Sequence, residues 1–123
     1  MANPNIVNVT NILGNSLSVA VLTSATQLAS NASASGKVFK INSIVVANID
    51  GTTAADITVN IYSAAALGGT PLAIASTISV PADASLIVTD KTTAFYLLEN
   101  QSIGAIAGTT GDLVATISFE EIN

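Results

Sequence analysis

Residues 56–62 read DITVNIY, and their side chains alternate between aliphatic and polar types. In an extended strand the aliphatic residues at 57, 59 and 61 fall on one face, and Thr58, Asn60 and Tyr62 fall on the other. One face is therefore expected to pack in a core, and the other to contact water or a neighbouring molecule. This period of two is typical of a half-buried β-strand.

Strand patterns recur along the whole chain, in which Val, Ile and Thr are frequent and no segment shows the spacing of an amphipathic helix. Turn signals follow one another roughly every 8–12 residues, as in sandwiches and barrels. We predict an all-β fold: a single antiparallel β-sandwich, jelly-roll or immunoglobulin-like, with eight or nine short strands. The expected strands cover residues 5–12, 16–22, 37–48, 56–62, 72–80, 85–89, 93–98, 102–107 and 113–119, and the polar loop 23–36 could hold one more near Gln27.

One pair of strands carries a specific pairing signal. Residues 37–48 read KVFKINSIVVAN, and the connection to residues 56–62 contains Asp50-Gly51. An Asp-Gly pair suits a tight turn between antiparallel strands. We therefore predict that these two segments form a β-hairpin.

The chain length of 123 residues corresponds to one domain, residues 1–123, with no disulfide because there is no cysteine. Residues 1–12 form either a first strand or an extended N-terminal arm that pairs with another subunit. We expect this arm and the loop 23–36 to reach neighbouring subunits. The opening MANPNIVNVTNIL has neither a basic region nor a long apolar run, so we expect a protein made inside a cell without an export signal.

Charge is scarce: 9% of the residues are charged, against about 25% in an ordinary soluble domain. The net charge of −5 argues against partners that are nucleic acids or anionic membranes. No apolar run reaches the length of a membrane helix. Either Thr, Ser and Asn supply the polar surface, or partner proteins cover much of the exterior.

The side chains needed for most catalysis are missing, because the chain has no histidine, cysteine, arginine or tryptophan. Glu120 and Glu121 are adjacent and would point to opposite faces of a strand, where they keep an edge soluble rather than act as a catalytic pair. We predict that the protein is not an enzyme, with no catalytic residues and no cofactor.

Calcium is the one metal that the available oxygen ligands suit. The five aspartates lie in or beside expected turns, where such side chains commonly bind nearby backbone N–H groups, and they follow no ligand spacing that we can name. We therefore predict no metal site. The aspartates are Asp50, Asp56, Asp83, Asp90 and Asp112.

A few apolar or aromatic residues are candidates for contact with partners. Tyr62 lies opposite the aliphatic face of its strand, which favours an interface, although a half-buried sheet tyrosine explains it equally well. Tyr96 is a second aromatic candidate. The candidate interface residues are Ile6, Val7, Val9, Tyr62 and Tyr96.

Three stretches, residues 36–62, 75–108 and 112–122, carry a family resemblance. The order of the expected hairpin, the VPA turn at 80–82, an aromatic strand and the EEI ending at 120–122 resembles small β-rich virion proteins of tailed bacteriophages, cyanophages included. The chain departs from this family at residues 100–103, which read NQSI where the family has a turn resembling Asp-Ser-Ile.

The resemblance implies a virion structural protein, assembled in the host cytoplasm, with no catalytic residues to carry over. We expect a capsid decoration or cement subunit that binds the major capsid protein or other virion proteins. The alternative is a neck, tail or fibre-associated subunit, which includes receptor binding. Because virion proteins occur in symmetric copies, we expect a homo-oligomer, for which a trimer is plausible.

Overall fold

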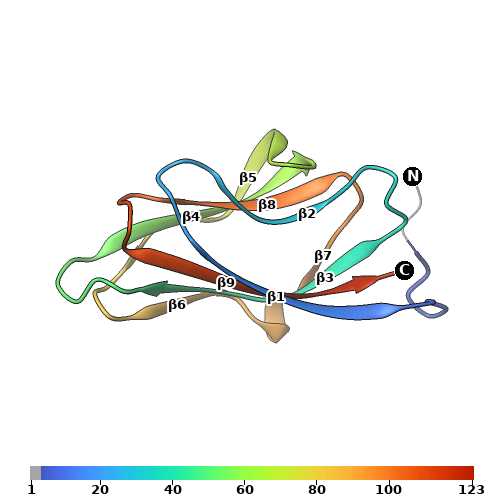
Figure 1. The fold of residues 1–123 in the computed structure, drawn as a ribbon, viewed down its shortest axis with the longest axis horizontal. Helices are drawn as coiled ribbons and strands as arrows, with labels where there is room; N and C mark the ends of the chain where they lie inside the picture. Colours follow the sequence, from blue (N-terminus) through green and yellow to red (C-terminus); the bar gives the residue numbers. More distant parts are fainter. Residues whose placement is uncertain (1–3) are drawn as a thin grey trace.

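A computed structural model describes residues 4–123 as two antiparallel β-sheets packed face to face (Figure 1). This arrangement confirms the predicted β-sandwich. The only helical element in that range is one turn of 3-10 helix, η1 (Lys91–Thr93). The strands are β1 (Ile12–Ala20), β2 (Thr26–Asn31), β3 (Val38–Asn48), β4 (Ala55–Ala64), β5 (Gly68–Val80), β6 (Ser85–Thr89), β7 (Phe95–Leu97), β8 (Gln101–Ala107) and β9 (Leu113–Ile122).

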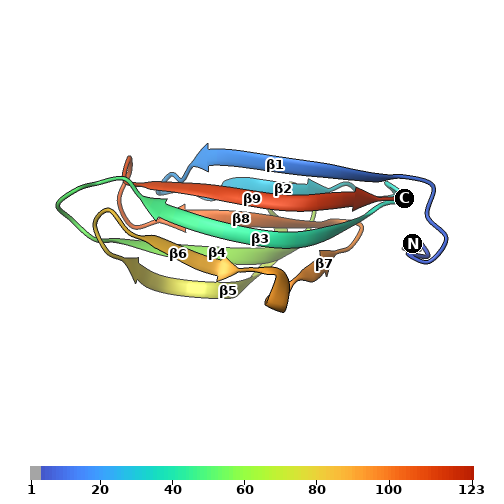
Figure 2. The same cartoon turned by 90° about the horizontal axis from the view of Figure 1, so that it is seen from below.

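The two sheets place four strands in the interior and five at the edges. The first sheet has the order β1-β9-β3-β6, and β7 also pairs with β3 on the side of β6. The second sheet has the order β2-β8-β4-β5. In Figure 2, β1 and β2 lie along one side of the sandwich, and β5 and β6 lie along the other. We call β1, β2, β5, β6 and β7 the outer strands.

The core lies between the sheets and is filled by alternate residues of the central strands. Ile44 on β3 and Ile117 on β9 are fully buried, as are Ile57 on β4 and Ile103 on β8. Burying each such side chain stabilises the fold by roughly 1.5–3 kcal/mol. On β4, the aliphatic residues at 57, 59 and 61 that alternate in the sequence are thus the ones that pack in or against the core.

Two buried asparagines connect the sheets. Asn31 on β2 donates hydrogen bonds from its amide Nδ2 to the backbone oxygens of Lys37 and Leu97. Asn48 on β3 donates in the same way to the backbone oxygens of Thr53 and Val80, both at 2.9 Å. Each side chain thereby satisfies one buried carbonyl, that of Leu97 or of Val80, which would be costly to leave without a partner, and one carbonyl that is only partly buried.

The predicted hairpin between residues 37–48 and 56–62 is wrong. Strand β3 pairs with β9 on one side and with β6 and β7 on the other, whereas β4 pairs with β5 and β8 in the opposite sheet. The Asp50-Gly51 pair lies in a connection that crosses from one sheet to the other. An Asp-Gly pair favours a tight turn in any setting, so it could not specify which strands would pair.

The N-terminal third also differs from the expectation. The expected strand over residues 5–12 is wrong, because Asn8 donates to the oxygen of Asn5 in a turn. The single strand β1 replaces both this strand and the one expected over 16–22. Residues 1–3 of the proposed N-terminal arm lie outside the described residues. The loop expected over 23–36 contains β2, in agreement with the short strand considered near Gln27.

Candidate functional site: the outer strands

Charged residues are distributed unevenly over the sandwich. All five outer strands are free of Asp, Glu, Lys and Arg, and no charged residue occurs at all in residues 1–36 or 57–82. The eleven charged side chains (three lysines and eight carboxylates) lie on central strands or in connections. Proteins commonly place charge on edge strands to prevent unwanted pairing with other chains. The outer strands here lack that protection.

Exposed aliphatic side chains gather on the same strands. In the part of the chain that the structure describes, none of the exposed large hydrophobic residues lies on the central strands β3, β4, β8 or β9. Those on the outer strands are Ile12, Leu13 and Leu17 of β1, Leu72, Ile74 and Ile78 of β5, Ile87 of β6 and Tyr96 of β7. Clustered apolar exposure without charge is typical of surfaces that contact other proteins.

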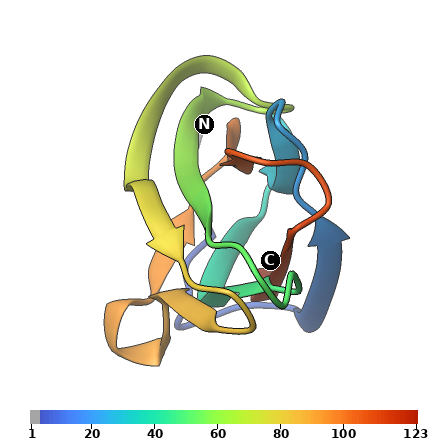
Figure 3. The ribbon, with the colours of Figure 1, turned by 90° about the vertical axis from the view of Figure 1, so that its left-hand side faces the viewer.

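The outer strands form two separate surfaces, visible when the sandwich is viewed from one end (Figure 3). One surface is the free edge of β1, beside that of β2. The other is the β5–β6 side, which we define by Leu72, Ile74, Ile78 and Ile87. Leu72 is the most exposed aliphatic residue on the outer strands, with a relative exposure of 71%.

Strand β1 pairs with β9 without interruption. Nine consecutive residues of β1 face nine of β9 with no shift in register, from Ile12 opposite Ile122 to Ala20 opposite Val114. Asn11 and Asn123 exchange both backbone hydrogen bonds, which extends the ladder beyond β1. The strand contains neither proline nor a bulge. Within residues 4–123, no strand pairs with its other edge.

Strand β5 is longer but irregular. Its pairing with β4 shifts register three times, and it contains Pro71. Thr77 adopts a left-handed backbone conformation with φ of 50°, which is uncommon for a β-branched residue. Bulges and proline both hinder the addition of a further strand to an edge. The β5–β6 side is therefore suited to contact through side chains rather than through backbone pairing.

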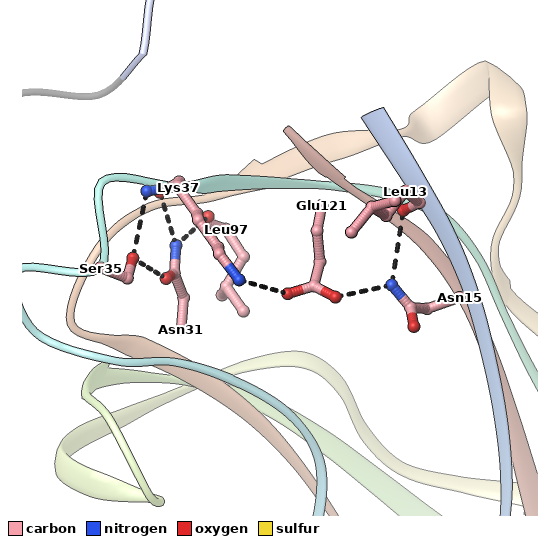
Figure 4. A network of polar contacts seen from close by, with 7 residues as sticks. All are labelled: Leu13, Asn15, Asn31, Ser35, Lys37, Leu97 and Glu121. Carbon is pink, nitrogen blue, oxygen red and sulfur yellow. Dashed lines mark hydrogen bonds and ion pairs between the residues drawn. The ribbon is translucent and has the colours of Figure 1, made fainter. Parts of the chain in front are cut away.

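A polar network fastens β1 to its neighbours (Figure 4). Glu121 on β9 accepts a hydrogen bond from the Nδ2 of Asn15 at 2.8 Å through one carboxylate oxygen. Its other oxygen pairs with the Nζ of Lys37 at 3.3 Å. The ion pair is partly exposed and is worth at most about 1 kcal/mol, so it stabilises the attachment of β1 only modestly.

The structure brings two of the candidate interface residues together. Ile6 and Tyr96, both about half-exposed, line an open hollow of about 260 Å³ with Pro4, Val38 and Leu98. Val7 and Val9 do not line it. Val7 is 91% exposed, and Val9 is half-buried.

Tyr62 lies on the side of its strand that the sequence indicates, but it is not exposed. Its relative exposure is 6%, and it is not part of the core cluster between the sheets. A Cβ atom on Gly104 would come within 2.7 Å of Leu67 and 3.0 Å of the Tyr62 ring, so all three residues are packed closely together. The β4–β5 connection covers this position, because the N–H of Leu67 donates to Ser102 on β8. The isolated chain therefore presents almost none of Tyr62 to a partner.

Asp50 and Asp90 accept hydrogen bonds from neighbouring residues, as the sequence indicates, whereas Asp56 lies in strand β4. The hydroxyl of Thr53 and the backbone N–H and hydroxyl of Thr52 donate to Asp50, which lowers the pKa of its carboxyl to about 2. The hydroxyl and N–H of Thr92 similarly lower the pKa of Asp90, at the start of η1. Over residues 4–123, three or more metal-ligating side chains nowhere come together as a group that could hold an ion. The same residues include no helix of sufficient length and hydrophobicity to cross a membrane.

Comparisons with known proteins give only weak likenesses to solved structures. No protein-family model matches the chain, and no curated protein matches it. A solved structure described as a Bacillus endospore appendage, from a novel family of disulfide-linked pili, is 15% identical over 99% of this chain and 92% of that chain, with a TM-score of 0.49. A structure of the Gx strain of infectious bursal disease virus is 12% identical over 93% of this chain and 42% of that chain, with a TM-score of 0.33. These values are too low to bear on the function of this chain.

Proposed function

We propose that this protein is a structural subunit of a bacteriophage virion, and specifically a decoration subunit that binds and stabilises the capsid shell. One observation carries the proposal: every outer strand lacks charge, and the exposed aliphatic side chains of the sheets lie on those strands alone. The resemblance of residues 36–62, 75–108 and 112–122 to phage virion proteins supports a structural role in a virion, and it is equally compatible with the shell, the neck and the tail. The protein would act through contacts, making and breaking no covalent bond.

The β5–β6 side is the surface that we assign to the shell. Its aliphatic side chains, Leu72, Ile74, Ile78 and Ile87, project from strands that are held by the sandwich behind them. Burial of apolar surface contributes about 25 cal/mol per Å², part of which is offset by the entropy lost on association. A modest contact of this kind becomes effective when it is repeated over many symmetry-related copies.

Rigidity of the subunit supports a cementing role. Two of the buried asparagines, Asn31 and Asn48, connect the sheets through hydrogen bonds to backbone carbonyls. The carbonyl of Val80, which Asn48 binds, ends strand β5. The proposed contact strand is therefore anchored to the opposite sheet at its C-terminal end. Because the strand is already ordered, less conformational entropy is lost when it binds the shell.

Co-sedimentation with capsid shells that lack this protein tests the proposal. We expect the wild-type chain to sediment with the shells and Leu72→Asp to remain largely in the supernatant. Ile49→Asp is the matched control, because Ile49 is also an exposed aliphatic residue but lies in the connection between β3 and β4. Failure of the wild-type chain to bind would contradict a decoration role, and equal loss in both variants would contradict the assigned surface.

The number of copies per virion separates decoration from the alternative position at the neck or tail. A shell protein occurs in hundreds of copies, whereas a neck ring with closed cyclic symmetry holds about a dozen. Quantitative gel staining of purified virions gives this number. A count near a dozen would replace decoration by a neck or tail role.

A further inference from the structure

The free edge of β1 offers backbone hydrogen-bonding groups to another strand. In an antiparallel pair, successive residues alternately point their N–H and C=O groups toward and away from the partner strand. Asn11 and Asn123 exchange both bonds, and Val21 donates to Leu113, so the odd-numbered residues of β1 bond to β9. The even-numbered residues, from Ile12 to Ala20, therefore point their backbone groups toward the open edge.

Nothing in β1 opposes the arrival of a second strand. The strand has no charge, no proline and no bulge, which are the usual features that protect an edge. It is the only outer strand of more than six residues whose pairing register is uninterrupted. A partner strand added here would continue the first sheet.

The side chains of β1 form a self-complementary pattern centred on Asn15. Leu13 and Leu17 flank it symmetrically, and all three side chains lie on the face of the sheet that is turned toward the core. Both leucines are about half-exposed, because β1 extends along the edge of the sandwich. If two copies of β1 pair antiparallel about a two-fold axis at Asn15, Leu13 of each copy lies opposite Leu17 of the other.

This register also pairs the backbone N–H and C=O groups at the open edge of β1 with hydrogen-bonding partners. It places the outward-facing groups of Gly14 in one copy opposite those of Ser16 in the other, and the even-numbered residues pair with even-numbered residues throughout. The two Leu13–Leu17 pairs then occupy non-hydrogen-bonded positions, where the Cα atoms are about 4.5 Å apart and side chains pack most closely. Because residues 1–36 are uncharged, no like charges face each other along the two paired strands.

We propose that two copies of this chain associate through β1, in antiparallel register about a two-fold axis at Asn15, to form a dimer with a continuous sheet. A closed two-fold contact uses the same surface on both copies and ends there. The β5–β6 side of each copy lies on the opposite side of the sandwich and stays free. The dimer does not depend on the proposed role in the capsid, and it specifies a two-fold contact where the sequence left a trimer open.

Single-cysteine cross-linking tests the register directly, because the wild-type chain contains no cysteine. In a non-hydrogen-bonded antiparallel pair, the Cα separation falls at the lower end of the range of about 4.4–6.8 Å that a disulfide bridges. We expect mild oxidation to link Asn15→Cys into a covalent dimer on a non-reducing gel, and to link Ser16→Cys and Ser18→Cys much less. Strongest linkage at another position, or equal linkage at all three, would overturn the proposed axis.

A charge exchange tests the leucine pairs and separates lost pairing from lost folding. Leu17→Glu alone should raise the dissociation constant of the dimer roughly tenfold or more, because the change occurs twice in a symmetric dimer. The double variant Leu13→Lys/Leu17→Glu places lysine opposite glutamate across the axis and should return the constant to within about threefold of wild type. Leu72→Glu on the opposite side is the control and should leave it unchanged.

Sedimentation equilibrium supplies these constants, with thermal melts to confirm that each variant folds. The expected wild-type species has twice the chain mass of 12.3 kDa. A wild-type chain that is monomeric at all concentrations, a trimer, or an open-ended polymer would each contradict the two-fold contact. A double variant that folds but does not recover dimerisation would contradict the register. None of these results bears on shell binding, which the co-sedimentation experiment measures separately.

Discussion

Strands β1 and β5 are both long, uncharged strands at the edge of a sheet, and they differ in how their edges are protected. β5 carries three shifts in register, a proline and a left-handed Thr77, whereas β1 has an unbroken ladder with β9. The contrast shows that lack of charge alone does not define how an edge is used. An irregular backbone limits β5 to contacts made by side chains, and a regular one allows β1 to accept another strand.

The largest effect is expected when β1 receives a proline, which is one of the features that protect the edge of β5. Ser16→Pro removes an N–H group that points to the open edge and takes part in no bond to β9, so the fold should persist while dimerisation is lost. Ser16→Thr keeps the N–H group and should still dimerise. Sedimentation equilibrium with a thermal melt distinguishes the two, and a fully dimeric Ser16→Pro protein would refute strand pairing at this edge.

The second test removes the anchor of β5. Asn48→Ala leaves the carbonyls of Thr53 and Val80 without their side-chain donor, which should lower the free energy of unfolding by about 1–3 kcal/mol. Because β1 lies on the other side of the sandwich, the dissociation constant of the dimer should change little. Chemical denaturation and sedimentation equilibrium measure the two quantities. A loss of dimerisation in the folded variant would show that the two edges are not independent.

The third test concerns the left-handed backbone conformation of Thr77, which is one of the irregular features of β5. Thr77→Gly removes the steric cost of a left-handed backbone at a β-branched residue and should stabilise the protein by about 1 kcal/mol. The matched control is Thr70→Gly, on the same strand but outside the left-handed region, which should destabilise it by about 0.5–1 kcal/mol. Changes of the same sign in the two melts would mean that Thr77 stores no strain.

The smallest expected effect is the change in stability at low pH, because protonation acts on Asp50 in a connection and not on the outer strands. Hydrogen bonds from Thr53 and Thr52 lower the pKa of Asp50 from 3.8 to about 2, so its stabilising contribution is present above pH 3.8 and is lost as the pH falls toward 2. Asp50→Asn should therefore melt below wild type at pH 5, and the difference should shrink at pH 2. An undiminished difference at pH 2 would contradict this assignment.

The sequence predicts the class of fold and most strands of the C-terminal two-thirds, and residues 85–89 coincide with β6. The alternation of aliphatic and polar residues indicates which side chains face a core, and strands of both sheets show this alternation. It does not report which strands pair, because pairing depends on contacts between residues far apart in the chain. Asp50-Gly51 thus indicates a turn correctly, while the partner of β3 proves to be β9, some seventy residues further on.

The sequence indicates only part of the contact surfaces. Tyr62 was identified by its place on the polar face of its strand, but the covering β4–β5 connection could not be foreseen without the hydrogen bond from Leu67 to Ser102. The sequence pattern predicts separate strands over residues 5–12 and 16–22, which divides Leu13 from Leu17 and hides the continuous strand β1. The absence of charge from residues 1–36 and 57–82 was visible in the sequence. Its significance depends on the structure, which shows that β1, β2 and β5 within those segments lie at the edges of the sheets.

Amide hydrogen exchange, resolved by residue and measured at several protein concentrations, tests most directly whether β1 is a pairing edge and β5 is not. We expect the amides of Gly14 and Ser16, which point to the open edge, to be protected at high concentration and to exchange freely on dilution. The free-edge amides of β5 should exchange freely at every concentration. Free exchange of Gly14 and Ser16 at all concentrations, or equal concentration-dependent protection of both edges, would contradict this expectation.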